Sequence, residues 1–243
     1  PRVAAMRNVV PAAALFLALA WPSRAVKSSG KSNGKSFRRS GAWVLSKEYM
    51  AQARCNQSGI PAIECAYKLD ERLATCLAQL FRGRSVTELG AGVGRYKRFI
   101  EGTGLAGVYT AYDGLADVAT LTNGRVHALD LTIDSQALVR SDWALSLEVA
   151  EHIPAQFEQT LLRNWDRANS QGIALSWSSM GSAQSAHGHV NPKRKSQVRL
   201  LLGPLGYVED RNASAVLRRC ATFLYLKRGV QVFRRNQAHS APK

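Results

Sequence analysis

The sequence predicts an α/β fold, in which a seven-stranded, mostly parallel sheet carries helices on both faces. Short apolar runs alternate with helical patterns along residues 67–235, as expected when helices connect parallel strands. Four consecutive runs each end in an acidic residue, and a glycine-rich turn follows the first of them. The length of 243 residues and the apolar fraction of 46% suit one domain of this kind with extensions.

The first 25 residues are typical of a targeting segment. Arg2 and Arg7 precede an apolar run over residues 9–21, which is shorter than the ~20 residues of a membrane-spanning helix. Small residues follow, so residues 1–25 fit a secretory signal peptide or a short anchor. Abundant Arg, Ser and Ala before the first acid, Glu48, also fit an organelle transit peptide. We expect the secretory pathway, lumenal or secreted, with an organelle as the alternative; membrane contact is expected only through this segment if it stays uncleaved.

Residues 26–50 are expected to form a flexible basic linker, because their Ser, Gly and Lys residues cannot bury enough apolar area to offset the entropy of ordering. Nine Lys/Arg and one acid among residues 1–50 supply +8 of the formal net charge of +16. The other half lies in the remaining chain, where it could favour an anionic acceptor. We do not expect nucleic acid as a partner.

The chain has four cysteines, Cys55, Cys65, Cys76 and Cys220. None forms a C-x-x-C pair, so we expect no zinc site. Cys55 and Cys65 bracket a short loop that could be bridged in an oxidising compartment, although buried free thiols fit equally well. Glycosylation sequons at Asn56 and Asn212 give the secretory interpretation weak support, since such triplets often arise by chance.

Residues 51–84 are predicted to form a loop and then a helix over 67–81 that packs on the sheet. Apolar residues recur there at helical spacing, acidic residues lie in the first turn, and Gly83 ends the helix. The main domain spans residues 85–235, and a disordered tail is expected over 236–243.

Strands and helices alternate within this domain. The predicted strands cover residues 86–89, 107–112, 125–129, 143–147, 172–177, 207–209 and 223–233. The predicted helices begin at Lys97 and cover 154–168 and 196–202. Pro154 suits the first turn of its helix, where a missing N–H costs little.

The glycine-rich turn reads Glu88-Leu89-Gly90-Ala91-Gly92-Val93-Gly94-Arg95. Glycines let a chain turn sharply and approach a ligand closely, and the helix that follows directs its unpaired N–H groups toward that ligand. A dinucleotide fingerprint needs a third glycine where Arg95 stands, so that interpretation is weakened. The pattern instead resembles motif I of the class I S-adenosyl-L-methionine (SAM)-dependent methyltransferases, a resemblance that implies a Rossmann-like fold.

This resemblance implies a set of cofactor-binding residues: Glu88, Gly90, Ala91, Gly92, Gly94, Asp113, Gly114, Asp130, Leu131, Leu147 and Glu148. Asp113 lies 19 residues after Gly94, a spacing that fits a carboxylate accepting the ribose hydroxyls of an adenosine. In the family, the next strand end contacts the adenine, which matches Asp130-Leu131. Leu147 and Glu148 would flank the donor methyl group.

Two further stretches resemble the small-molecule branch of this family, Glu148-Val149-Ala150-Glu151-His152 and Gly188-His189-Val190-Asn191. The resemblance covers residues 67–235 and implies methyl transfer to a small-molecule or glycan acceptor, at oxygen. His152, His187 and His189 are the candidate catalytic bases, since a histidine can titrate near neutral pH. No metal is expected, because no carboxylate is adjacent to His187 or His189.

Two other functions fit the same residues: a SAM- or nucleotide-binding module without catalysis, and an NAD-dependent oxidoreductase. The basic run over residues 193–195 follows the second stretch and would suit an anionic acceptor.

Overall fold

The computed structural model describes residues 35–37, 43–45, 67–180 and 188–236. Its main sheet has seven strands in the order β5-β4-β3-β6-β7-β9-β8, and all neighbours are parallel except that β9 runs antiparallel to β7 and β8. The strands are β3 (Val86–Leu89), β4 (Tyr109–Asp113), β5 (His127–Ala128), β6 (Ser141–Ser146), β7 (Asn169–Leu175), β8 (Tyr207–Glu209) and β9 (Gln231–Arg235). The predicted Rossmann-like fold is confirmed.

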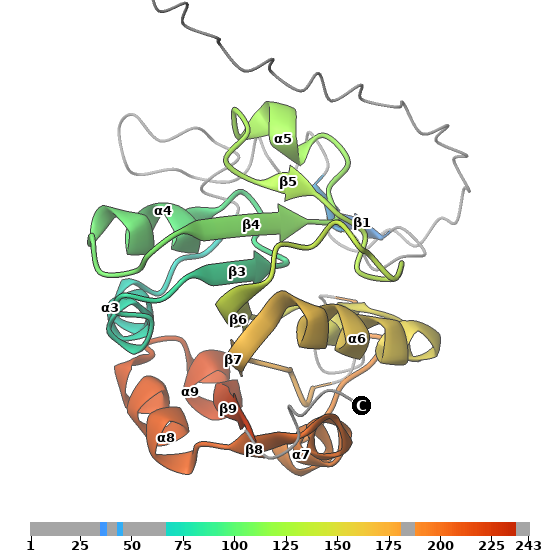
Figure 1. Cartoon of the computed structure of the whole chain (residues 1–243). Coiled ribbons are helices and arrows are strands. Elements are labelled where there is room, and N and C mark those ends of the chain that lie inside the picture. The colour runs from blue at the N-terminus through green and yellow to red at the C-terminus, as the bar shows by residue number, and fades with distance from the viewer. Residues whose placement is uncertain (1–34, 38–42, 46–66, 181–187, 237–243) are drawn as a thin grey trace, which may run out of the picture.

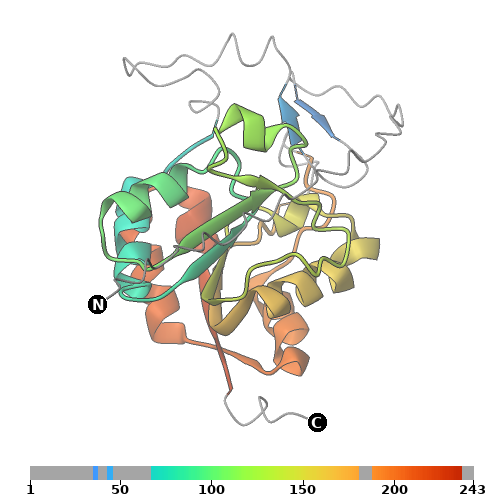
Figure 2. The ribbon, with the colours of Figure 1, turned by 45° about the horizontal axis from the view of Figure 1, so that its top comes forward.

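Helices cover both faces of this sheet, as Figures 1 and 2 show. They are α3 (Glu71–Leu80), α4 (Arg95–Gly102), α5 (Val118–Leu121), α6 (Glu158–Ala168), α7 (Lys195–Leu202), α8 (Arg211–Cys220) and α9 (Leu224–Gly229). Three short 3₁₀ helices join them: η1 (Ala150–His152), η2 (Ala155–Phe157) and η3 (Gly203–Leu205).

The core is divided between the two faces by the alternation of strand side chains. Along β6, Ala144 belongs to the apolar cluster shared with α6 and α7. Its neighbours Trp143 and Leu145 belong to the cluster shared with α3 and α8. The middle of β6, from Trp143 to Leu145, is apolar and buried on both faces, as expected for a strand inside a parallel sheet.

The order of the strands reverses at β3. The chain runs outward from β3 through β4 to β5, and then returns to place β6 on the other side of β3. In open α/β sheets, ligands bind at the carboxyl ends of the strands where the order reverses. The topology therefore places the glycine-rich turn, which directly follows β3, at the expected ligand site.

The predicted strand over 223–233 is wrong in its first half, where the chain forms α9 before β9 begins. The N–H groups of Lys227 and Val230 donate to Phe223 O and Leu226 O, which are helical bonds. A mostly apolar run over only a few residues does not separate a strand from a short helix. The predicted strand over 125–129 is likewise reduced to β5, because Arg125 and Val126 bond back to Thr122.

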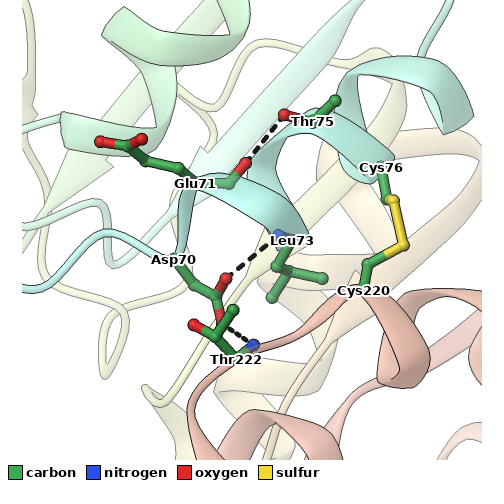
Figure 3. The surroundings of a disulfide bond; sticks show 7 residues. All are labelled: Asp70, Glu71, Leu73, Thr75, Cys76, Cys220 and Thr222. Carbon is green, nitrogen blue, oxygen red and sulfur yellow. Dashed lines mark hydrogen bonds between the residues drawn. A yellow bond between two sulfur atoms is a disulfide. The ribbon is translucent and has the colours of Figure 1, made fainter.

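Asp70 fixes the start of α3 and joins it to the segment that follows α8 (Figure 3). One carboxylate oxygen caps the helix by accepting the Leu73 N–H, and the other accepts the N–H groups of Thr222 and Phe223. Burial alone would raise the pKa of Asp70, but these N–H donors outweigh it and hold the pKa below its ordinary value. The helix therefore begins at Glu71 rather than at residue 67.

A disulfide between Cys76 and Cys220 joins α3 to the end of α8 (Figure 3). The sequence did not indicate this pairing, because Cys76 fits the apolar spacing of its helix. The suggested bridge between Cys55 and Cys65 lies outside the described residues, as do Asn56 and the tail over 237–243.

Two short segments of the linker that is expected to be flexible, residues 26–50, form paired strands. Strands β1 (Lys35–Phe37) and β2 (Trp43–Leu45) form an antiparallel two-stranded sheet. Among the helices that the structure describes, none has the length and apolar character needed to cross a membrane.

Candidate functional site

The glycine-rich turn requires its glycines. Gly90, Gly92 and Gly94 have φ angles of 81°, 57° and 76°, in the left-handed region that side chains rarely adopt. A Cβ atom at Gly90 would lie 2.2 Å from a methyl group of Val149, and one at Gly92 would lie 2.4 Å from the ring of Tyr67. The turn is therefore packed closely against the end of β6 on one side and against Tyr67 on another.

Asp113, at the end of β4, is joined directly to this turn. Its Oδ2 accepts the N–H of Gly92 at 2.7 Å, and its Oδ1 accepts the N–H of Leu115 at 2.9 Å. Desolvation by the surrounding protein raises the pKa of Asp113 to about 6, although these two N–H donors oppose the rise. Each carboxylate oxygen has a second lone pair, so the side chain can still accept the hydroxyl groups of a ligand.

Tyr67 covers the turn and is a residue that the sequence did not indicate. Its hydroxyl is buried and has no hydrogen-bond partner among the described residues. Burial raises the pKa of Tyr67 well above its ordinary value, and the charges of Asp113 and Asp117 add to the rise. This buried hydroxyl is close enough to Asp113 to be affected by its charge, and it is a second polar group that a ribose could satisfy.

Arg95 and Tyr96, which begin α4, form hydrogen bonds with the segment that leads into α3. The guanidinium of Arg95 donates to the carbonyl of Tyr67 at 2.7 Å, which holds Tyr67 in place. The hydroxyl of Tyr96 accepts the N–H of Asp70 at 3.3 Å. Arg95, which stands where a dinucleotide fingerprint has its third glycine, therefore has a structural role in holding Tyr67.

Glu88 lies beneath the turn rather than on the open rim. Its side chain is 4% exposed and accepts the hydroxyl of Tyr109 at 3.0 Å. Burial raises the pKa of Glu88 to about 8, and the nearby charge of Asp113 contributes to the rise. Burial therefore favours the protonated form of this carboxyl group, which faces Tyr109 of the neighbouring strand.

The remaining predicted cofactor residues follow the other strand ends. Ala91 lies within the turn, and Gly114 directly follows Asp113. Asp130 closes its own turn, since its Oδ1 accepts the N–H and the hydroxyl of Thr132 at 2.9 and 2.7 Å. Leu131 beside it is buried, as expected for a residue that could pack against an adenine.

Glu148 follows β6 in an unusual backbone conformation. Its φ of 54° is rare for a residue with a side chain and costs about 1–3 kcal/mol. Ser176, at the end of β7, compensates by accepting the N–H of Glu148 at 2.8 Å and donating to its Oε1 at 2.7 Å. Leu147 before it is half-buried against the α3 side of the core.

Glu151, His152 and His189 form a compact cluster beside Glu148. Ligand atoms of the three side chains all lie within 4.8 Å of one another, and the two imidazole rings are 4.9 Å apart, edge to face. Glu151 and His152 belong to η1, and His189 lies on the segment after β7. Burial raises the pKa of Glu151 well above its ordinary value, and the charge of Glu148 raises it further. His187 lies outside the described residues.

The segment that carries His189 is fastened by Asn191. The Asn191 carbonyl accepts the indole N–H of Trp177 at 2.7 Å, and its side chain donates to Glu158 at 2.9 Å. Lys193 forms an ion pair with Glu158 at 2.7 Å and lies over the Trp177 ring. Lys193 therefore serves this support, whereas Arg194 and Lys195 are exposed.

No family model matches the sequence, and no curated protein matches it. Solved structures match its fold. The methyltransferase domain of bacterial CtHen1-C is 14% identical over 70% of this chain and 100% of that one, with a TM-score of 0.53. A TehB-like SAM-dependent methyltransferase from Corynebacterium glutamicum is 13% identical over 72% and 92% of the chains, with a TM-score of 0.50. The pyocyanin biosynthetic protein PhzM is 20% identical over 78% and 61%, also at 0.50.

The fold of this chain is therefore that of the class I SAM-dependent methyltransferases. At the reversal point of the sheet, the structure brings together the glycine-rich turn, Asp113 and the end of β6. Tyr67 and Glu151 complete the site but were not assigned from sequence. Tyr67 is far from the motif along the chain, whereas Glu151 stands inside a recognised stretch, three residues after Glu148.

Proposed function

We propose that this protein transfers a methyl group from SAM to a small-molecule or glycan acceptor, at a hydroxyl oxygen. The observation that carries the proposal is the bond between Gly92 and Asp113. It fixes a left-handed glycine turn and an acid on the next strand end in one rigid unit, at the point where the strand order reverses. An adenosine needs a turn whose backbone it can approach closely and a carboxylate that accepts its two ribose hydroxyls.

The residues of the chain fit such a cofactor. Asp113 would accept the ribose hydroxyls with its unused lone pairs, and Tyr67 would contribute its buried hydroxyl, which has no partner among the described residues. Asp130 and Leu131 would hold the adenine by a hydrogen bond and an apolar contact. Leu147 and Glu148, at the end of β6, would border the reacting centre.

When bound, SAM would supply a methyl group that its sulfonium already activates. The chain therefore needs mainly to align the acceptor with that methyl group and to exclude water. The strained conformation of Glu148, locked by Ser176, provides a fixed wall for this purpose. Strain of this kind is concentrated at functional sites, where the surrounding structure maintains it.

We propose a small molecule as the acceptor and, more specifically, an anionic glycan. Arg194 and Lys195 support it by their exposure near the His189 segment, but Lys193 does not, since Glu158 neutralises it. Incubating the protein with isotopically labelled SAM and cell extracts, followed by mass spectrometry of small molecules and glycans, would identify the acceptor and the methylated atom.

We also propose that the protein resides in the secretory pathway. The disulfide between Cys76 and Cys220 supports an oxidising compartment, because disulfides rarely persist in the cytosol. The apolar segment over residues 9–21 supports the same route.

Heat denaturation with added cofactor tests the enzyme proposal. SAM at 100 times its dissociation constant should increase the free energy of unfolding by about 2.7 kcal/mol, and NAD should leave it unchanged. Stabilisation by NAD alone would favour an oxidoreductase. Stabilisation by SAM without methylation of any acceptor tested would favour a binding module.

A further inference from the structure

We propose that Glu151, His152 and His189 bind a divalent transition-metal ion at the carboxyl edge of the sheet. One carboxylate and two imidazoles lie with their ligand atoms within 4.8 Å of one another. From the sequence no metal is expected, because no acid is adjacent to His189. The fold supplies the acid from a different segment, since η1 after β6 and the segment after β7 meet at this edge.

Glu151 is a buried acid whose oxygens the donors of the described residues leave unsatisfied. Its side chain is 0% exposed, and neither carboxylate oxygen accepts a hydrogen bond from an N–H or O–H group of the described residues. The carboxyl group of Glu148 lies close enough to share a proton with Glu151, and together with burial it raises the pKa of Glu151, whereas the N–H groups of Glu151 and Ser178 lower it. Buried carboxylates are nearly always paired with another group or bound to a metal ion, because a buried charge without compensation destabilises the fold.

Both histidines are oriented as metal ligands usually are. Nδ1 of His152 faces the carbonyl of Gly188 at 3.3 Å, and Nδ1 of His189 faces the carbonyl of Met180 at 2.6 Å. A carbonyl oxygen can only accept, so each Nδ1 carries the proton, and a metal ion would bind the Nε2 of each ring. Metal-binding histidines usually donate their other ring N–H to a carbonyl or carboxylate in this way, which fixes the tautomer.

The two segments that carry the ligands are held in register by the backbone. The N–H groups of Val190 and Asn191 both donate to the carbonyl of Glu151, at 2.8 and 3.0 Å. His189 is therefore placed beside Glu151 by bonds that do not involve either side chain. Asn191 extends the support to Trp177 and Glu158, so the ligand geometry is fixed before any ion binds.

The ligand types indicate which ions would bind. Two imidazoles and one carboxylate suit zinc, iron(II), cobalt(II) and manganese(II), whereas magnesium and calcium prefer ligand sets made of oxygen. Three protein ligands leave at least one coordination position for water or for an oxygen of the acceptor.

The proposed role of this ion rests on the proposed function, although the binding site itself does not. A metal-bound acceptor hydroxyl would release its proton to water more readily, since the ion lowers its pKa. The resulting oxygen would form the O–CH₃ bond as the S–CH₃ bond of SAM breaks, giving the methyl ether, the neutral thioether and the released proton. His152 and His189 would then act as metal ligands rather than as the bases that the sequence indicates.

Cobalt(II) titration of the full chain, without SAM and without a histidine tag, tests the site directly. We expect one equivalent of Co²⁺ to give visible absorption, and Zn²⁺ to displace it. His189→Ala and Glu151→Gln should each weaken binding at least about tenfold, since loss of even a supporting residue costs roughly 10–100-fold. His189 is the safer site to change, because it is only half-buried.

Matched controls are His127→Ala and Glu71→Gln, which remove an exposed histidine and an exposed glutamate from other elements and should bind Co²⁺ like the wild type. Absence of binding, or unchanged binding in both His189→Ala and Glu151→Gln, would overturn the proposal. SAM stabilisation measured in EDTA keeps the two proposals separable. Stabilisation without Co²⁺ binding defeats only the metal site, and Co²⁺ binding without SAM stabilisation defeats only the proposed function.

Discussion

Asp113 is the residue whose bonds make the most direct prediction. It holds Gly92 and would hold the ribose with the same carboxylate, so Asp113→Ala should weaken SAM binding by about 1.5–3 kcal/mol, the worth of charge-assisted hydrogen bonds. Isothermal titration with SAM measures this change. Asp134→Asn, which alters an exposed acid bound to Arg163 and Arg167, should bind SAM normally. Unchanged affinity in Asp113→Ala would contradict the ribose assignment.

Glu88 predicts a dependence of stability on pH. Its pKa of about 8 in the fold exceeds the ordinary value of 4.5, so between these values the native state keeps a proton that the unfolded state has released. Stability from this residue is thus fully present below pH ~4.5 and is lost progressively as the pH rises through about 8.

Glu88→Gln tests this directly, because the amide can still accept the hydroxyl of Tyr109 but cannot ionise. Denaturant unfolding from pH 4 to 9 should show the variant gaining stability relative to the wild type as the pH rises. Asp113 is present in both proteins, so the difference between them reports Glu88 together with its interaction with Asp113. Parallel curves for the two proteins would show that Glu88 is not buried as described, and Glu71→Gln, which changes an exposed acid, should follow the wild type.

Single residues were predictable where the backbone demanded one residue type. The three glycines and Asp113 stand where a turn with positive φ meets the end of the next strand, and the sequence spacing encodes both. Glu88 was found, but its burial was not, because a position at a strand end does not reveal whether a side chain faces the rim or the core. Tyr67 carries no local signal, since only the folded chain places it over Gly92.

Elements were predictable where the burial pattern was clear. Helix α6 buries one face along its length, and β7 ends in a run of buried apolar residues, so their patterns distinguish a helix from a strand. The prediction over residues 223–233 failed because α9 has only six residues, which is too short for helical periodicity to show. A tertiary contact marks the start of α9, because Asp70 accepts the N–H groups of Thr222 and Phe223 just before the helix begins.

The architecture of the whole molecule was predictable because strands and helices alternate along the sequence, which indicates a parallel sheet. Acids at successive strand ends converge only if the strands are parallel, so their regularity predicted one functional edge. The sequence could not show which distant segments meet along that edge. The pairing of η1 with the segment after β7, which unites Glu151 with His189, depends on bonds to a backbone carbonyl that any residue could make.

The disulfide acts at the same scale, because it closes a loop between residues 144 positions apart. Cross-linking a long loop restricts the unfolded chain, so Cys76→Ala/Cys220→Ala should lower the free energy of unfolding by about 2–5 kcal/mol. Denaturant unfolding with and without reductant measures this loss. Reductant should bring the wild type down to the level of the double variant, while Cys55 and Cys65 contribute equally to both proteins. A double variant as stable as the oxidised wild type would remove this support for an oxidising compartment.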